Sequence, residues 1–178
     1  MKKTHSYDKY HDYITHQKTK TLDPARRKKW LNEEWDLKLS GFKKIFSKLL
    51  EENVLHKNSR ALCLGARTGQ EVLALRELGL DAVGIDIVPH ENLVLEGDMH
   101  DLNFQDNSFD FVFSNVFDHS LYPEKKISEI ERVLKVGGFC MIQFQVKIPS
   151  DEYSENEIDS IDHDVLSLFE QCKITHSE

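Results

Sequence analysis

The chain has 178 residues, a formal net charge of −8 and 39% hydrophobic residues. This length suits one domain with a real core. No run of 18 apolar residues occurs and the first residues are polar, which argues against a transmembrane helix and against secretion. The cysteines (Cys63, Cys140 and Cys172) are odd in number and scattered, which favours buried thiols in a reducing cytosol over disulfides. We therefore expect a cytoplasmic protein with no membrane contact.

Basic residues gather at the start of the chain. Residues 1–48 hold 13 Lys and Arg against 6 Asp and Glu, a net charge of +7, whereas residues 49–178 carry −15. Such a basic segment could attract nucleic acid, an anionic substrate or an acidic partner. The alternative, which we prefer, is that these cations form the solvated faces of amphipathic helices.

The first 20 residues combine three tyrosines with three histidines. Tyr7, Tyr10 and Tyr13 are spaced by three, as on one edge of a helix. The histidines match no compact ligand pattern, so we expect no metal site. This segment should be a terminal arm, either mobile or folded over a cofactor as a lid.

A helix should follow the arm. Asp23 can cap its start and Pro24 suits its first position. This helix carries Trp30 and Trp35, which either anchor it on the rest of the domain or form a stacking surface in a substrate pocket.

Ser40 and Gly41 should separate that helix from an amphipathic helix over residues 42–54. We therefore divide the chain into an N-terminal helical lid or arm, residues 1–56, and a second part, residues 57–178, whose motifs, described below, point to a cofactor-binding domain. The two should form one structural unit.

The second part begins with a strand, a glycine turn, a helix and a second strand. The strand at 61–64 and the strand at 82–85 are short apolar runs, as in buried parallel sheets. Between them lie the glycine turn at 65–69 and a helix over 72–78. The second strand ends in Asp86, about 20 residues after the turn, where an acid can bind both hydroxyls of a ribose.

Further strands and helices alternate along the chain. They are a strand over 92–96, a strand over 109–115, a helix from Pro123 that Gly137 and Gly138 close, and a strand over 139–144. This rhythm predicts an α/β fold with a doubly wound, mostly parallel sheet. Ligands bind such sheets beyond the carboxyl ends of the strands. The acidic tail should hold one helix around Val165 to Phe169. Asp159, Asp162, His163 and Asp164 should lie at a solvated helix start rather than on a metal.

Four motifs in this order resemble class I S-adenosylmethionine-dependent methyltransferases of the type 11 kind. They are the glycine turn at 65–69, Glu96-Gly97-Asp98-Met99, the strand end at Ser114-Asn115, and Arg132-Val133-Leu134-Lys135-Val136-Gly137-Gly138. The resemblance covers residues 60 to about 146. The family usually adds two further strands, but only residues 173–178 remain for them. We expect truncated C-terminal strands, so that the sheet edge is either open or covered by the N-terminal helices or by a partner in a homo- or hetero-oligomer.

The resemblance implies that S-adenosylmethionine is the cofactor. The implied binding residues are Gly65, Ala66, Arg67, Thr68, Gly69, Glu71, Asp86, Ile87, Asp98, Met99 and Asn115. Asp86 would bind the ribose hydroxyls, Asp98 the adenine amino group, and Asn115 would border the methionine end.

The glycine motif departs from the family pattern at two positions. Cys63 stands where an acid is common, and Arg67 stands where a glycine is common. Glu71 could replace the missing acid or only complement the helix dipole. Arg67 could point outward to pair with an acid or reach the carboxylate of the cofactor.

Methyl transfer from a sulfonium needs mainly in-line alignment, and a base only where the acceptor loses a proton. His119 and Asp118, just beyond the fourth strand, are the candidate catalytic residues. The alternative role of both is to structure this loop.

Three functions remain open. The first is methyl transfer to a small-molecule or sugar-like acceptor held under the N-terminal helices. The second is a catalytically weak methyltransferase-like subunit that a partner completes. The third is a nucleic-acid or protein methyltransferase guided by the basic segment, although no aromatic-proline motif follows the fourth strand at residues 114–117.

Overall fold

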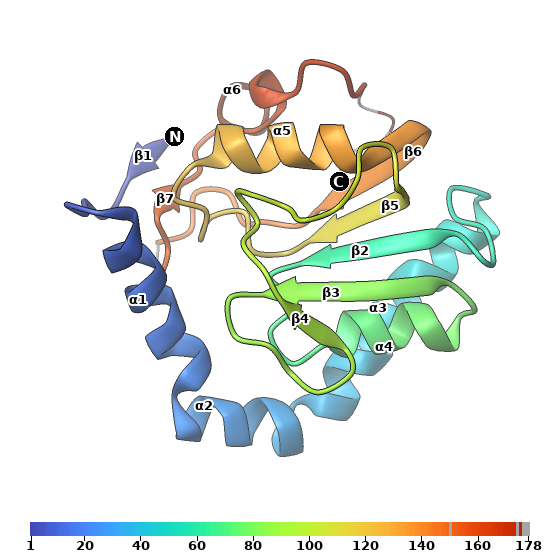
Figure 1. The fold of residues 1–178 in the computed structure, drawn as a ribbon, viewed down its shortest axis with the longest axis horizontal. Helices are drawn as coiled ribbons and strands as arrows, with labels where there is room; N and C mark the ends of the chain where they lie inside the picture. Colours follow the sequence, from blue (N-terminus) through green and yellow to red (C-terminus); the bar gives the residue numbers. More distant parts are fainter. Residues whose placement is uncertain (150, 174, 176–178) are drawn as a thin grey trace.

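The computed structural model describes residues 1–149, 151–173 and 175. Its centre is a five-stranded sheet in the order β4-β3-β2-β5-β6, in which every neighbouring pair is parallel (Figure 1). The strands are β2 (Arg60–Leu64), β3 (Asp81–Asp86), β4 (Val94–Glu96), β5 (Phe109–Ser114) and β6 (Leu134–Ile142). The predicted doubly wound, mostly parallel fold is confirmed.

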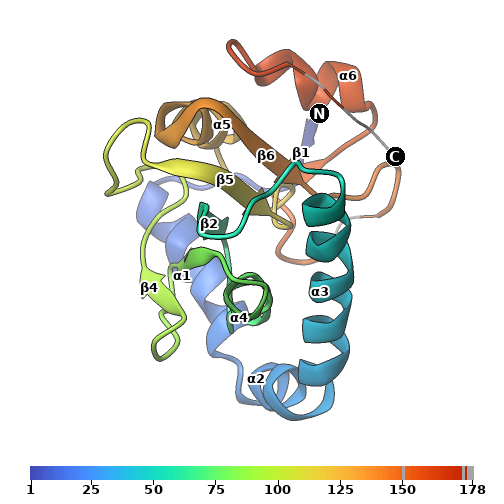
Figure 2. The same ribbon diagram turned by 90° about the vertical axis from the view of Figure 1, so that its right-hand side faces the viewer.

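Two apolar cores lie on the two faces of this sheet. On one face, Phe46 of α3 (Trp35–Glu51) packs edge-on against Phe113 with ring centroids 5.2 Å apart, and α4 (Gln70–Glu77) joins the same core. On the other face, Ile127 of α5 (Pro123–Val133) belongs to a separate core. Figure 2 shows α5 and the pair of α3 and α4 on opposite sides of the strands. Central strands that are covered on both faces explain the continuous apolar runs of the sequence.

The N-terminal part lies across the carboxyl ends of the strands, where α1 runs down one side of the sheet (Figure 1). Its elements are β1 (Lys2–Lys3), α1 (Tyr10–Leu22), α2 (Pro24–Lys28) and a π-helical turn, η1 (Lys29–Glu33), which leads into α3. The predicted cap is present, because Asp23 Oδ1 accepts from the Arg26 N–H at 2.7 Å. At the start of the chain, β1 pairs antiparallel with β7 (Asn156–Glu157).

The predicted helix break at Ser40 and Gly41 is wrong. Both residues lie inside α3, and the chain bends instead at the π-turn and Glu34. A glycine costs about 1 kcal/mol inside a helix. The apolar face of α3, which packs Phe42 and Phe46 against the sheet, outweighs that cost.

The predicted helix closure at Gly137 and Gly138 is also wrong, because α5 ends at Val133 and both glycines lie inside β6. The final carbonyls of α5 find partners in a preceding loop. The Asn107 N–H donates to Arg132 O at 3.0 Å, and the Ser108 N–H donates to Val133 O at 2.8 Å. A glycine cap is therefore not needed.

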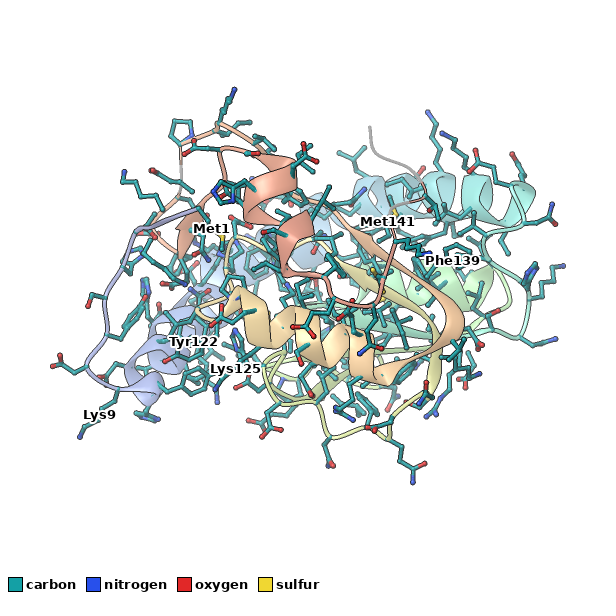
Figure 3. All side chains as sticks on the ribbon, turned by 90° about the horizontal axis from the view of Figure 1, so that it is seen from above. Met1, Lys9, Tyr122, Lys125, Phe139 and Met141 are labelled. Atoms are coloured by element: carbon teal, nitrogen blue, oxygen red, sulfur yellow. The ribbon has the colours of Figure 1, made fainter. Side chains whose placement is uncertain are left out.

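The acidic tail differs from the prediction as well. In place of a helix around Val165 to Phe169, it holds α6 (Ile161–Asp164) and a 3-10 turn, η2 (Leu166–Leu168). Most of the final segment, residues 173–178, falls outside the described residues. Within the described part of the chain no strand pairs with the outer edge of β6, along which Phe139 and Met141 lie (Figure 3). No described helix is both long and apolar enough to cross a bilayer.

Candidate functional site

The glycine turn after β2 is pressed against its neighbours. Gly65 and Gly69 have φ of +72° and +85°, a region that favours glycine. A Cβ on Gly65 would lie 2.2 Å from Val116 Cγ2, and one on Gly69 would lie 2.7 Å from Leu93 Cβ. The turn can therefore bring its backbone close to a ligand only because both positions lack side chains.

Arg67 adopts a positive φ of +50° at the position where the family pattern has glycine. Its guanidinium stacks on Trp30, with the central carbon 4.3 Å from the ring centroid. Trp30 is buried, and its carbonyl accepts from Gln70 Nε2 at 3.2 Å. The contacts thus support the anchor interpretation of this tryptophan, which fixes the π-turn on the glycine turn.

Asp86 lies at the end of β3 with both oxygens facing backbone donors. Oδ2 accepts from the Arg67 N–H and Oδ1 from the Val88 N–H, each at 3.0 Å. Burial raises the pKa of Asp86, and these two hydrogen bonds oppose the rise. Because a carboxylate oxygen has two lone pairs, each oxygen retains an acceptor site.

Asp98 follows β4 and accepts three hydrogen bonds. Oδ1 accepts from the backbone N–H and from Nδ1 of His100, both at 2.9 Å, and Oδ2 accepts from the Tyr10 hydroxyl of α1. The Tyr122 N–H donates to His100 Nε2 at 3.3 Å, so the ring proton is on Nδ1. Burial alone would raise the pKa of Asp98, but the hydrogen bonds from His100 and Tyr10 lower it.

A first hollow, which we call the α1 hollow, lies between α1 and the strand ends. Its empty volume is about 550 Å³ with its open mouth included. It is lined by Tyr13, Gln17, Lys20 and Thr21 of α1 and by Gly65, Arg67, Ile85, Asp86, Ile87, Gly97, Asp98, Met99, Val116 and His119. The predicted ribose and adenine contacts therefore share one hollow.

A second hollow, the α3 hollow, lies on the other side of the glycine turn with an empty volume of about 380 Å³. It is lined by Lys38 and Phe42 of α3 and by Gly65, Ala66, Arg67, Gln70, Glu71 and Asn115. Gly65 and Arg67 border both hollows. Of the predicted cofactor residues, Thr68 and Gly69 line neither, and the Thr68 hydroxyl donates to Gln70 Oε1 at 2.7 Å.

Glu71 is the unusual group of the α3 hollow. Its side chain is buried, and burial raises its pKa to about 7. Among the described residues it forms no ion pair. The charges of Arg67 and Lys38 act on it only from a distance, and the ammonium of Lys38 is paired with Glu34 Oε2 at 2.7 Å. A buried carboxylate without a cation is costly, so this hollow suits a positively charged ligand group.

His119 lines the α1 hollow with both ring nitrogens engaged. Tyr153 O lies 2.7 Å from Nδ1 and can only accept, so Nδ1 carries the proton. Nε2 then accepts from Lys20 Nζ at 3.1 Å, and Lys20 is also 3.2 Å from Asp151 Oδ2. Burial lowers the pKa of His119. The lone pair of the predicted base is therefore shared with a lysine that sequence reasoning missed, since nothing marks it among the lysines of the arm.

Asp118, the other catalytic candidate, lines neither hollow. Its Oδ2 accepts from the Ser154 hydroxyl at 2.9 Å and lies 3.8 Å from His119 Nε2. These contacts are those of a residue that structures the loop, the alternative that the sequence left open.

Comparison with known proteins gives a consistent result. Residues 62–142 match a family model described as a methyltransferase domain. Uncharacterized methyltransferases of Mycobacterium bovis and Mycobacterium tuberculosis are each 35% identical in an alignment 89 residues long, which covers 44% of this chain and 37% of each relative. The chain thus matches well under half the length of these relatives. A candidate methyltransferase from Bacillus halodurans, 19% identical, superposes with a TM-score of 0.56 over 68% of this chain and 65% of its own, and shares the fold.

Proposed function

We propose that the chain binds S-adenosylmethionine and transfers its methyl group to a small-molecule or sugar-like acceptor under the N-terminal helices. The match of residues 62–142 to a methyltransferase-domain model and the fold shared with a candidate methyltransferase support the proposal. One observation carries the proposal. The buried carboxyl of Glu71, which forms no ion pair with the described residues, lies across the glycine turn from a hollow lined by Asp86 and Asp98.

The residues of the two hollows suit the polar groups of this cofactor. In the α3 hollow, Glu71 would hold the ammonium of the methionine part, and Lys38 and Arg67 would face its carboxylate. In the α1 hollow, the remaining lone pairs of Asp86 would accept from the ribose hydroxyls, and Asp98 would accept from the adenine amino group. When bound, the cofactor supplies an electrophilic methyl group on a sulfonium.

The chain itself contributes mainly alignment. Gly65 borders both hollows and has no side chain, so the sulfonium of a cofactor that spans the two hollows would lie beside its backbone. Holding the acceptor in line under α1 would supply much of the acceleration. For an acceptor that loses a proton, His119 Nε2 at the wall of the α1 hollow would receive it once Lys20 Nζ, which donates to this lone pair at 3.1 Å, has turned fully toward Asp151 Oδ2.

The basic N-terminal segment does not favour a nucleic-acid substrate. Several of its cations pair with acids of the chain itself, as Arg26 does with Glu152 at 2.7 Å and Lys29 with Glu34 at 2.8 Å. Lys43 likewise pairs with Glu77. These pairs reduce the charge available to a phosphate backbone, on which such binding largely depends.

Titration calorimetry with S-adenosylmethionine tests the proposal. We expect saturable binding that Glu71→Gln weakens by about 10- to 100-fold, the range for a hydrogen bond to a charged group. Glu77→Gln on the same helix, 40% exposed, is the matched control and should bind like the wild type. Absence of binding at millimolar cofactor would remove the proposal. Binding without methyl transfer to any member of a small-molecule panel would favour the catalytically weak subunit.

A further inference from the structure

We infer that the Tyr10 hydroxyl occupies one of the two acceptor sites of Asp98 Oδ2, the oxygen left for the adenine amino group, so that the first turn of α1 competes with the cofactor for Asp98. The inference rests on the proposed function and adds to it a residue that neither the sequence motifs nor the comparisons indicate. It begins from the three hydrogen bonds that Asp98 accepts.

Of these donors, only Tyr10 comes from outside the β4 loop. His100 is two residues from Asp98, and its ring is fixed on the far side, where Nε2 lies 2.7 Å from the Ser120 hydroxyl and accepts from the Tyr122 N–H. It cannot leave without disrupting the loop. Tyr10 is 88 residues away in sequence, on a helix, and is therefore the donor that a ligand can replace.

The aromatic surroundings hold Tyr10 in this position. Its ring stacks on Tyr122 with centroids 5.8 Å apart and an interplanar angle of 15°, and it meets His100 edge-on at 5.8 Å. Tyr13, one turn further along α1, lies 5.4 Å away and lines the α1 hollow. A planar aromatic group that donates a hydrogen bond to Asp98 is also what adenine presents. The phenol therefore offers the protein the same kind of contact from its own chain.

Contacts on both sides of Tyr10 in the sequence hold the N-terminal arm against the rest of the domain, an arrangement that we call the closed arm. Glu155 is fully buried and accepts from the Tyr7 hydroxyl and from Gln17 Nε2, each at 2.7 Å. The Thr4 N–H adds a bond to Glu155 O at 3.0 Å. These bonds flank the first turn of α1 on both sides. Ligand binding must therefore oppose a closed state that is stabilised by several contacts, and the apparent affinity falls in proportion to the fraction that is open.

The variant Tyr10→Phe removes the hydroxyl that competes for Asp98 and keeps the aromatic ring. It keeps the stacking on Tyr122, frees Asp98 Oδ2 and also removes the 2.7 Å contact of the hydroxyl with His100 Nδ1. The matched control is Tyr122→Phe, since the Tyr122 hydroxyl makes no hydrogen bond within the described part of the chain. The probes are S-adenosylhomocysteine and S-inosylhomocysteine, because the second carries a 6-oxo group in place of the amino donor. Binding is measured by calorimetry, and thermal melts monitor folding.

We expect Tyr10→Phe to tighten binding of S-adenosylhomocysteine by about three- to tenfold, as removal of a competing closed state does. Binding of S-inosylhomocysteine should change less, and Tyr122→Phe should alter neither. Hydrogen exchange of the wild type should rise at residues 9–13 when the adenosyl probe binds.

Unchanged or weaker adenosyl binding by Tyr10→Phe would overturn the inference, because Tyr10 would then only orient Asp98, and the proposed function would survive. An equal gain for both probes would also overturn it, because the effect would then come from a looser arm. If wild type and variants all fail to bind, the proposed function fails and this inference fails with it.

Discussion

The two hollows on either side of the glycine turn differ in how the protein completes them. In the α1 hollow, the protein meets Asp98 with its own donors, Tyr10 and His100. In the α3 hollow, Glu71 is buried beside Asn115 and receives no cation from the described residues. In the free protein Asp98 therefore has hydrogen-bond donors from the chain itself, whereas Glu71 has no ion-pair partner among the described residues.

This difference separates two costs of ligand binding. At the α1 hollow a ligand must displace contacts that already exist, so part of its binding energy is spent on opening the arm. At the α3 hollow a cationic ligand lowers the cost of burying the Glu71 carboxylate, which forms no ion pair among the described residues and whose pKa burial raises to about 7. We therefore expect most of the binding free energy to come from the contact with Glu71. The cost of opening the N-terminal arm then lowers the measured affinity.

We expect the largest effect on stability from Gly65→Ala, which changes a residue that lines both hollows. Gly65→Ala places a Cβ 2.2 Å from Val116 Cγ2 at a φ of +72°. We expect a loss of about 2–4 kcal/mol in the free energy of unfolding, since a core clash adds to backbone strain. Urea denaturation measures it. Gly41→Ala, where a Cβ would meet nothing within 4 Å, is the control and should stabilise α3 by up to about 1 kcal/mol. Equal effects of the two changes would contradict the crowding at the turn.

Glu71→Gln should stabilise the protein even though it weakens ligand binding. The pKa of Glu71 is about 7 in the folded state and about 4.5 when unfolded, so folding favours its protonated form. That stability is fully present below pH 4.5 and is lost as the pH rises through 7. Above pH 7 the variant should therefore exceed the wild type by up to about 3 kcal/mol, at 1.36 kcal/mol per pKa unit.

Denaturation at pH 4 and pH 8 provides the measurement. Glu77→Gln, on the exposed side of α4, should show no such pH-dependent gain. A Glu71→Gln variant that is no more stable than the wild type at pH 8 would mean that an unseen partner satisfies this carboxyl.

The two hollows should also differ in their response to pH. A cationic ligand requires Glu71 to be ionised, so affinity for S-adenosylmethionine should fall about tenfold between pH 8 and pH 6, the size that linkage gives for a pKa near 7. Asp98, whose pKa is lowered, stays ionised throughout this range. Calorimetry across this range should show the loss in the wild type and not in Glu71→Gln. A flat wild-type profile would place the ligand charge elsewhere.

The smallest expected effect on stability is that of Arg67→Gly, which removes a side chain that borders both hollows. Arg67→Gly relieves a positive φ that costs about 1–2 kcal/mol and loses a stacking contact with Trp30 of about 0.5–1 kcal/mol. These terms nearly cancel, so we expect a change within about 1 kcal/mol in urea denaturation. A loss well beyond that would show that Arg67 carries the attachment of the π-turn.

The sequence predicted which residues of the sheet side lie together, because its signals there are local. Asp86 was identified from one strand, one glycine turn and a spacing of about 20 residues, and it does line the α1 hollow with Asp98. The lid side could not be found in this way. Tyr10 meets Asp98 across 88 residues and Lys20 meets His119 across 99, and no periodicity marks either pair. The misplaced helix break has a similar cause, since the packing of α3 on the sheet overrode the local preference of Gly41.

The π-turn at Lys29–Glu33 sets the angle by which the preceding arm is rotated about the helix axis relative to α3. It contains one residue more per turn than the helices around it, and the Glu34 N–H bonds to Lys29 O at 2.9 Å across five residues. Deleting one residue there would restore α-helical spacing and rotate everything before it by about 100° about the helix axis, since a helix has 3.6 residues per turn. Tyr10 and Lys20 would then swing away from the strand ends together. A single inserted or deleted residue can thus uncouple the arm from the sheet while every strand remains in place.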